Sequence, residues 1–201
     1  MAKLYFKYGA MGSSKTAQAL ITKYNYEEND MRVWLIKPSA DTRDGKATLR
    51  SRIGLEAEVE VMAPDADIYN RFRATQADSC NAVIVDECQF LTPEQIDQLR
   101  AIVDDFNVPV MCFGLRTDFQ TKLFPGSRRL MEIADTIQEI KTICACAAKA
   151  TVNARIDSEG HIVTEGAQVV LGGNDCYIAM CHRCYKKAIN EHKKIRLHGQ
   201  N

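Results

Sequence analysis

Short apolar runs, separated by helical and polar stretches, make up most of the chain. These runs and one alternating segment predict strands over residues 3–8, 31–37, 57–62, 81–86, 108–114 and 136–142. Helices are expected over residues 15–28 and 65–77, after residue 92, and in a short piece before the last strand. Polar stretches predict loops over residues 38–53 and 115–127. Strands that alternate with helices in this way indicate an α/β fold with a parallel sheet.

Two local signals support the centre of this arrangement. The run NAVIVD at 81–86 is apolar almost throughout, which is typical of a central parallel strand covered on both faces. The helix after it has a marked start, because Thr92 can cap it, Pro93 suits its first position and Gln95 completes a capping box.

The pattern changes after Lys141. Pairs of cysteines there flank short β segments, with turn signals at residues 157–160 and 172–174. We therefore predict a core over residues 1–142, a small second domain over 143–195 and a polar tail over 196–201, to which we assign no function. A domain of that size builds little core alone, and a metal would stabilise it.

Composition and charge narrow the class of protein. The 201 residues carry 26 basic and 26 acidic side chains, which argues against a protein that binds polyanions through bulk positive charge. No run approaches the roughly 18 consecutive apolar residues of a membrane span, and the start of the chain does not resemble a signal peptide. We expect a cytoplasmic protein that has no nucleic-acid or membrane partner.

A phosphate-binding loop is expected between the first strand and the first helix. The segment GAMGSSKT comprises Gly9, Ala10, Met11, Gly12, Ser13, Ser14, Lys15 and Thr16. Its backbone N–H groups could bind phosphate oxygens, Lys15 could contact the β- and γ-phosphates, and Thr16 could bind Mg²⁺. Ser14 replaces the usual second glycine, and we expect it to need no positive φ if it opens the helix. The alternative is a glycine–serine turn with a chance Lys-Thr pair.

Two carboxylates follow the central strand. Asp86 and Glu87 lie where ligands bind in open α/β sheets, at the carboxyl end of a strand. Asp86 suits a Mg²⁺ role through water, and Glu87 suits a general base that accepts a proton from an attacking hydroxyl. The alternative is two solvated acids at the end of a strand. Together with the loop, the pair indicates nucleoside triphosphate chemistry.

Four cysteines form two close pairs that predict one structural Zn²⁺ site. The pairs are Cys144 with Cys146 and Cys181 with Cys184, and four thiolates make a closed tetrahedral site. Cys176 and His182 are rival ligands, and the other alternative is a set of reduced cysteines without metal. The remaining thiols at Cys80, Cys88 and Cys112 lie in apolar surroundings, and we expect them to be ordinary buried thiols.

The same chain resembles the type II thymidine kinases of bacteria and animal cytosol over about residues 3–190. Five segments in order carry the resemblance: GAMGSSKT at 9–16, KPSADTR at 37–43, DECQF at 86–90, FGLRTDFQTKLFPGS at 113–127, and the cysteine pairs flanking LGGNDCY at 171–177. The resemblance implies a RecA-like P-loop core and a C-terminal zinc ribbon bearing a lasso loop. It implies transfer of the ATP γ-phosphate to the 5′-hydroxyl of thymidine, and of deoxyuridine more weakly, for nucleotide salvage.

The resemblance also implies roles for individual residues. Glu87 matches the family's base, Asp41 and Arg43 fall in the segment near the phosphates and metal, and Arg43 could stabilise charge on the transferred group. Residues around the nucleoside would be Phe90, Phe119, Phe124, Tyr177 and, in the lasso, Gly172. Plain core packing is the alternative for each aromatic residue. Family members are typically homotetramers inhibited by thymidine triphosphate, so both properties are expected here.

Two other classes of protein remain possible from the sequence. The Asp-Glu-Cys-Gln string is similar to motifs of helicase motors, but such a motor needs a nucleic-acid track and generally two sizeable domains. A zinc-ribbon binding module with a degenerate nucleotide-binding domain is the second alternative. Intact Lys15, Thr16, Asp86 and Glu87 argue against degeneracy.

Overall fold

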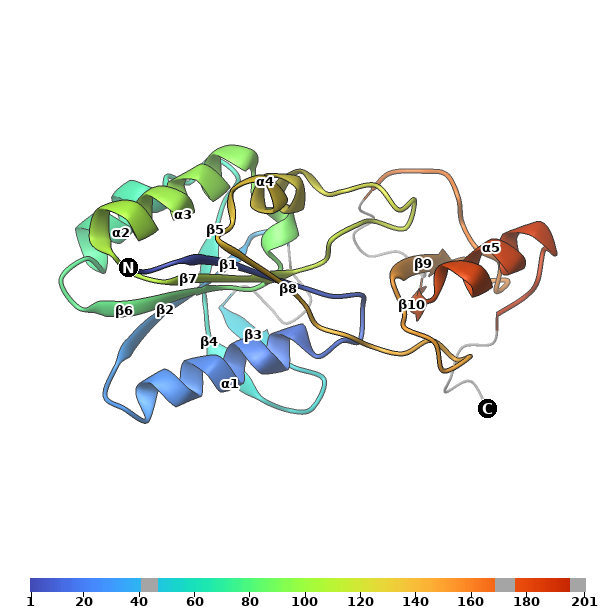
Figure 1. Ribbon diagram of the computed structural model, residues 1–201, viewed down its shortest axis with the longest axis horizontal. Coiled ribbons are helices and arrows are strands. Elements are labelled where there is room, and N and C mark those ends of the chain that lie inside the picture. Colours follow the sequence, from blue (N-terminus) through green and yellow to red (C-terminus); the bar gives the residue numbers. More distant parts are fainter. Residues whose placement is uncertain (41–46, 169–175, 196–201) are drawn as a thin grey trace. The chain divides into compact units, whose positions relative to one another are not determined.

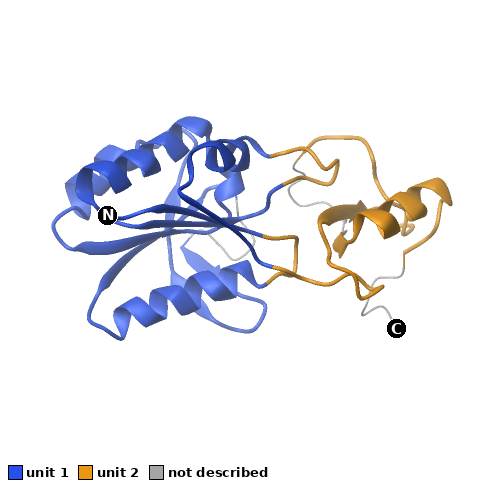
Figure 2. Cartoon of the chain, viewed as in Figure 1, with its two compact units in different colours: residues 1–8, 14–116, 124–140 blue, residues 9–13, 117–123, 141–201 orange. Residues whose placement is uncertain are grey.

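The computed structural model describes residues 1–40, 47–168 and 176–195, and the side chain of Cys176 lies outside this description. The chain forms two compact units (Figure 2). The sheet unit contains residues 1–8, 14–116 and 124–140, and the C-terminal unit contains residues 9–13, 117–123 and 141–201. Two short segments that precede residue 141 in sequence, 9–13 and 117–123, thus belong to the C-terminal unit.

A six-stranded sheet with the order β5-β2-β6-β7-β1-β8 forms the centre of the sheet unit. Every neighbouring pair of these strands is parallel. The strands are β1 (Leu4–Tyr8), β2 (Arg32–Pro38), β5 (Glu60–Met62), β6 (Cys80–Val85), β7 (Val110–Gly114) and β8 (Thr136–Glu139). The predicted α/β fold with a parallel sheet is therefore confirmed.

Helices cover both faces of this sheet (Figure 1). One face carries α2 (Ile68–Thr75), α3 (Pro93–Phe106) and α4 (Pro125–Ile133). The other face carries α1 (Lys15–Glu27) and the antiparallel hairpin of β3 (Thr48–Arg50) and β4 (Glu56–Glu58). Each expected helix is therefore present, with bounds that differ by a few residues from the predicted ones.

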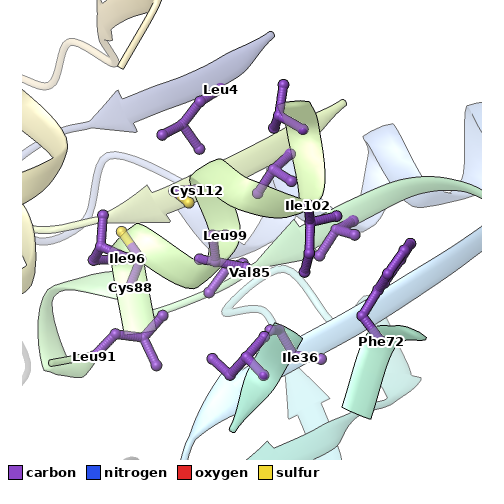
Figure 3. Close-up of a cluster of buried hydrophobic side chains, with 14 of the residues drawn as sticks. Leu4, Ile36, Phe72, Val85, Cys88, Leu91, Ile96, Leu99, Ile102 and Cys112 are labelled. Carbon is purple, nitrogen blue, oxygen red and sulfur yellow. The ribbon is translucent and has the colours of Figure 1, made fainter. Parts of the chain in front are cut away.

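Side chains of the central strands alternate between two hydrophobic cores. On β6, Val83 and Val85 pack in the core beneath α2, α3 and α4, whereas Ala82 and Ile84 pack in the core beneath α1. Figure 3 shows Val85 among side chains of the first core. The near-continuous apolar run over 81–86 arises because both faces of β6 are buried.

Local capping fixes where α2 and α3 begin. The Gln95 N–H donates to Thr92 Oγ1 and the Thr92 N–H donates to Gln95 Oε1, both at 3.2 Å, which confirms the predicted capping box. Asp67 caps α2 by accepting a hydrogen bond from the Asn70 N–H at 2.9 Å. These contacts satisfy backbone donors that the first turn of a helix leaves unpaired.

The single strand predicted over residues 57–62 is wrong. The segment divides into β4 and β5, which pair with β3 and β2 respectively. Between them Val59 is buried, and its N–H donates to the Ala47 carbonyl at 3.0 Å. The predicted loop over 38–53 is wrong at Thr48–Arg50, because those residues form β3 of the hairpin.

The C-terminal unit is built on a small antiparallel sheet. Strands β9 (Val152–Ile156) and β10 (Cys176–Met180) pair, and α5 (His182–Asn190) follows. Its core contains Cys144, Ala150, Val152, Ala154, Met180, Cys181 and Tyr185. The predicted turn at 157–160 is present, with Gly160 at φ 91° and its N–H donating to the Asp157 carbonyl. The turn predicted at 172–174 and the tail at 196–201 lie outside the described residues.

Candidate active site

The segment predicted to bind phosphate joins β1 to α1. Strand β1 ends at Tyr8 and α1 begins at Lys15, so the segment has the expected position between a strand and a helix. Gly12 and Ser14 both have left-handed backbones, with φ angles of 72° and 61°. The expectation that Ser14 needs no positive φ is therefore wrong. The tight turn into the helix imposes this conformation, which costs a non-glycine residue about 1–2 kcal/mol.

Asn153, which the sequence analysis did not single out, contacts this segment within the C-terminal unit. Its Oδ1 accepts a hydrogen bond from the Met11 N–H at 2.8 Å, and its Nδ2 donates to the Thr117 carbonyl at 2.8 Å. The side chain is almost fully buried on β9. Asn153 thus links the first residues of the phosphate loop to the 117–123 segment, and it engages one N–H that was predicted to face phosphate.

Thr16 and Asp86 meet at the carboxyl edge of the parallel sheet. The Thr16 hydroxyl donates to Asp86 Oδ2 at 2.8 Å, although 70 residues separate the two in sequence. Burial, followed by the charge of Glu87, raises the pKa of the Asp86 carboxyl to about 7. The Thr16 hydroxyl and the Lys15 ammonium oppose this shift. The motif in the first helix and the motif after the central strand therefore form one cluster.

This cluster suits a divalent cation. Among the described residues, Asp86 Oδ1 is the buried side-chain oxygen that has no hydrogen-bond partner. A hydroxyl and a carboxylate are oxygen ligands of the kind that Mg²⁺ prefers, and a cation would offset the cost of an ionised buried carboxylate. The donor set therefore fits the predicted roles of Thr16 and Asp86.

Glu87 has an unusual backbone and a firmly held side chain. Its φ and ψ angles are 51° and 35°, in the left-handed region that a glutamate rarely adopts. It immediately precedes the short 3₁₀ helix η1 (Cys88–Phe90), and its Oε2 accepts a hydrogen bond from Gln89 Nε2 at 2.5 Å. Strained residues of this kind gather at functional sites, where the surroundings hold them in place.

Two of the predicted nucleoside-binding aromatics contact one another in the sheet unit. The rings of Phe90 and Phe124 pack edge to face, with centroids 5.7 Å apart and an angle of 79° between planes. Phe90 is half-buried and Phe124 is buried. Phe90 ends η1 and Phe124 precedes α4, so the two elements present one aromatic pair.

The other two predicted aromatics belong to the C-terminal unit. Phe119 is only 1% exposed, its carbonyl accepts a hydrogen bond from the Tyr185 hydroxyl at 3.0 Å, and the Arg155 guanidinium lies 5.2 Å from its ring centroid. Tyr177 pairs with Arg155 across β9 and β10. Arg155 was not predicted, because a strand arginine carries no motif. The burial of Phe119 is also compatible with the alternative of core packing.

Three predicted site residues cannot be placed. Asp41, Arg43 and Gly172 lie outside the described residues.

The four cysteines predicted to bind zinc come together in the C-terminal unit. The Sγ atoms of Cys144, Cys146, Cys181 and Cys184 all lie within 4.8 Å of one another. Cys146 Sγ is 3.6 Å from Cys181 Sγ. Sulfurs that each lie about 2.3 Å from a tetrahedral Zn²⁺ are separated by about 3.8 Å, so the cluster has nearly the required size.

Hydrogen bonds within the cluster favour thiolate at one position. Burial raises the pKa of Cys144, but hydrogen bonds from backbone N–H groups of Cys146 and Cys181 and from the thiols of Cys146 and Cys184 together lower it to about 7. The Cys184 N–H also donates to Cys181 Sγ, at the start of α5. The rival ligand His182 is exposed and is not part of this cluster, and the side chain of Cys176 is not described.

The other predicted thiols are buried, as expected. Cys80, Cys88 and Cys112 are free cysteines of the sheet unit. Burial raises the pKa of Cys80, and it raises that of Cys88 well above the usual value. Such thiols hold little of the reactive thiolate.

In the described part of the chain, no helix has both the length and the apolar character needed to cross a membrane.

Comparison with known proteins gives one consistent result. The family model described as thymidine kinase matches residues 2–185. A thymidine kinase of Agrobacterium fabrum is 46% identical over 191 residues, which cover 94% of this chain and 99% of the relative. A thymidine kinase of Ruegeria pomeroyi is 44% identical over 192 residues, covering 95% and 97% of the two chains. One from Yersinia pseudotuberculosis is 43% identical over 190 residues, covering 94% and 97%. The chain therefore belongs to the thymidine kinase family.

Proposed function

We propose that the protein transfers the γ-phosphate of ATP to the 5′-hydroxyl of thymidine, and to that of deoxyuridine more weakly, in nucleotide salvage. Membership of the family makes the chain an ATP-dependent nucleoside kinase. The observation that carries the proposal is the cluster of Thr16 and Asp86 beside Glu87, in a chain that matches these kinases almost from end to end. That cluster would supply a metal site and a base, two of the functions that phosphoryl transfer uses.

In this proposal Glu87 accepts the proton of the 5′-hydroxyl. The 5′-oxygen then bonds to the γ-phosphorus while the bond from that phosphorus to the β-phosphate bridging oxygen breaks, and ADP leaves. Lys15 and the N–H groups of the phosphate loop would hold the phosphates of ATP. Mg²⁺ held by Thr16 and, through water, by Asp86 would neutralise negative charge on these phosphates, and Arg43 would stabilise the charge that develops on the transferred group.

The aromatic residues would bind the thymine ring. Phe90 and Phe124 offer one edge-to-face pair in the sheet unit, and Phe119 and Tyr177 belong to the C-terminal unit. Aromatic faces bury a pyrimidine well in offset or edge contacts. Gly172 and the backbone of the predicted lasso would read the base's polar edge.

We also propose that the four-cysteine cluster holds one structural Zn²⁺. Four cysteine ligands leave no open coordination position, so this metal would stabilise the fold and take no part in the chemistry. The ion would join Cys144 and Cys146 to the start of α5, where Cys181 and Cys184 lie. The homotetramer and the inhibition by thymidine triphosphate, both implied by the resemblance, remain predictions.

A panel of nucleosides tests the proposed function. We expect phosphorylation of thymidine with ATP and Mg²⁺, weaker phosphorylation of deoxyuridine, and none of purine nucleosides, measured as labelled monophosphate. ATP hydrolysis that is stimulated by DNA or RNA, without any nucleoside product, would favour the motor alternative. ATP binding without turnover would favour the binding-module alternative.

Replacing Lys15 with alanine tests the phosphate loop. We expect ATP to bind about 10- to 100-fold more weakly, because a hydrogen bond to a charged group typically contributes about 1.5–3 kcal/mol. Lys23→Ala on the same helix is the control, because Lys23 pairs with Glu27 one turn further on. The measurement is the dissociation constant of ATP by calorimetry, and unchanged affinity and turnover in Lys15→Ala would remove the assignment.

A further inference from the structure

We infer that Gln89 is a positioning residue that fixes the carboxylate of Glu87 for proton transfer. The inference rests on the proposed function, in which Glu87 is the base. Gln89 Nε2 donates to Glu87 Oε2 at 2.5 Å, and Gln89 Oε1 accepts a hydrogen bond from the Leu115 N–H at 2.9 Å. The side chain is only 1% exposed. One buried amide thus connects the proposed base to the backbone that follows β7.

The chemistry of the two contacts sets the orientation of the amide. A backbone N–H can only donate, so the oxygen of Gln89 must face Leu115. Its NH₂ group must then face Glu87, where it donates to Oε2. The hydrogen bond holds Oε2 in one position and thereby restricts the orientation of the whole carboxylate. Glutamine is therefore suited to orient this carboxylate.

Two glycines make room for the turn that carries Gln89. A Cβ on Gly114 would lie 2.5 Å from Gln89 Oε1 and 2.6 Å from Cys88 Sγ. On Gly126 of α4 it would lie 2.6 Å from the Leu91 carbonyl oxygen and 2.7 Å from that of Cys88. Neither glycine has a positive φ, so their role is to let η1 approach β7 and α4 closely.

The same turn is anchored in the hydrophobic core. Cys88, the first residue of η1, is fully buried and lies near Cys112 of β7 (Figure 3). Glu87, just before it, has the left-handed backbone that directs its side chain beside the amide of Gln89. Core packing, the close approach at Gly114 and the amide contacts together determine where the carboxylate lies.

Kinetics of Gln89→Met test this role. Methionine has a similar volume but cannot hold the carboxylate, and a reacting group that moves by about 1 Å can cost about 10²-fold in rate. We expect kcat for thymidine to fall by about 10²-fold, while KM for thymidine and for ATP stays within a few fold. In a Glu87→Gln background, Gln89→Met should lower kcat no further, because it acts only through Glu87.

Gln95→Met is the matched control. Gln95 is another buried glutamine of the sheet unit, and its Nε2 donates to the carbonyls of Ala63 and Ala66 at 2.8 and 3.1 Å. We expect it to lower the melting temperature and leave kcat unchanged. If Gln89→Met does not fold, Gln89→Asn takes its place, because its amide is one carbon too short to contact both Glu87 and Leu115.

The outcomes separate this inference from the proposed function. A wild-type chain that phosphorylates no thymidine would overturn both. An active wild-type chain with unchanged kcat in Gln89→Met, or with equal loss of kcat in the presence and absence of the Glu87 carboxylate, would overturn the inference alone.

Discussion

Glu87→Gln should lower kcat for thymidine phosphorylation by about 10²–10⁴-fold while thymidine and ATP still bind. That range is typical for loss of a general base. Glutamine has nearly the same shape as glutamate and keeps an oxygen that can accept the hydrogen bond from Gln89, so the site should keep its structure. Only the ability to take the proton of the 5′-hydroxyl is removed. Single-turnover kinetics with pre-bound ATP would measure the chemical step itself.

Glu94→Gln is a suitable control for this experiment. Glu94 is an exposed carboxylate in the first turn of α3, a few residues beyond Glu87. Its substitution removes the same charge near the same end of the sheet, and kcat should not change. A Glu87→Gln enzyme with nearly wild-type kcat would show that Glu87 is not the base. The neighbouring carboxylate of Asp86 would then be the candidate base.

The parallel core could be predicted because its signals are local. The apolar run over 81–86 becomes β6, between β2 and β7, and the capping residues at Thr92 and Gln95 begin α3 where expected. Burial on both faces dictates an apolar run, and an unpaired helix terminus dictates a cap. Neither signal depends on a distant partner.

The errors occur where a partner distant in sequence decides the structure. Alternation over 57–62 indicates extended structure, but it cannot show that the segment divides at Val59 into two strands with different pairing partners. The polar composition of 48–50 gives no sign that these residues pair with Glu56–Glu58. Strand pairing depends on which segments meet, and hydropathy alone does not report that.

The candidate site divides in the same way. The proximity of Thr16 and Asp86 could be predicted from the sequence, because a loop before a helix and an acid after a central strand lie at the same edge of a parallel sheet. Gln89 lies within the DECQF motif, yet its role depends on the backbone of Leu115. Asn153 has no motif, and its partner Met11 is 142 residues away. The roles of polar side chains that orient a loop or a carboxylate therefore become visible only in the three-dimensional structure.

The proposed zinc ion should have the largest effect on stability. Among the described residues, the hydrophobic cluster of the C-terminal unit has seven buried members, so hydrophobic burial alone contributes little to its stability. Structural Zn²⁺ in small domains contributes apparent binding free energies of about 10–16 kcal/mol at neutral pH. The same unit contains residues 9–13 of the phosphate loop and Phe119, so unfolding it would remove parts of the candidate site.

Cys146→Ala should therefore lose both zinc and activity. Cys146 is exposed, so its substitution costs little packing, and any large effect arises from the lost ligand. We expect zinc to fall from about one ion per chain to a small fraction, rapid hydrogen exchange throughout β10 and α5, and loss of thymidine phosphorylation. Cys80→Ser is the control, because Cys80 lies in the sheet unit and serine can still donate to the Ala82 carbonyl. Wild-type protein that contains no zinc, or Cys146→Ala protein with full protection and activity, would contradict the metal site.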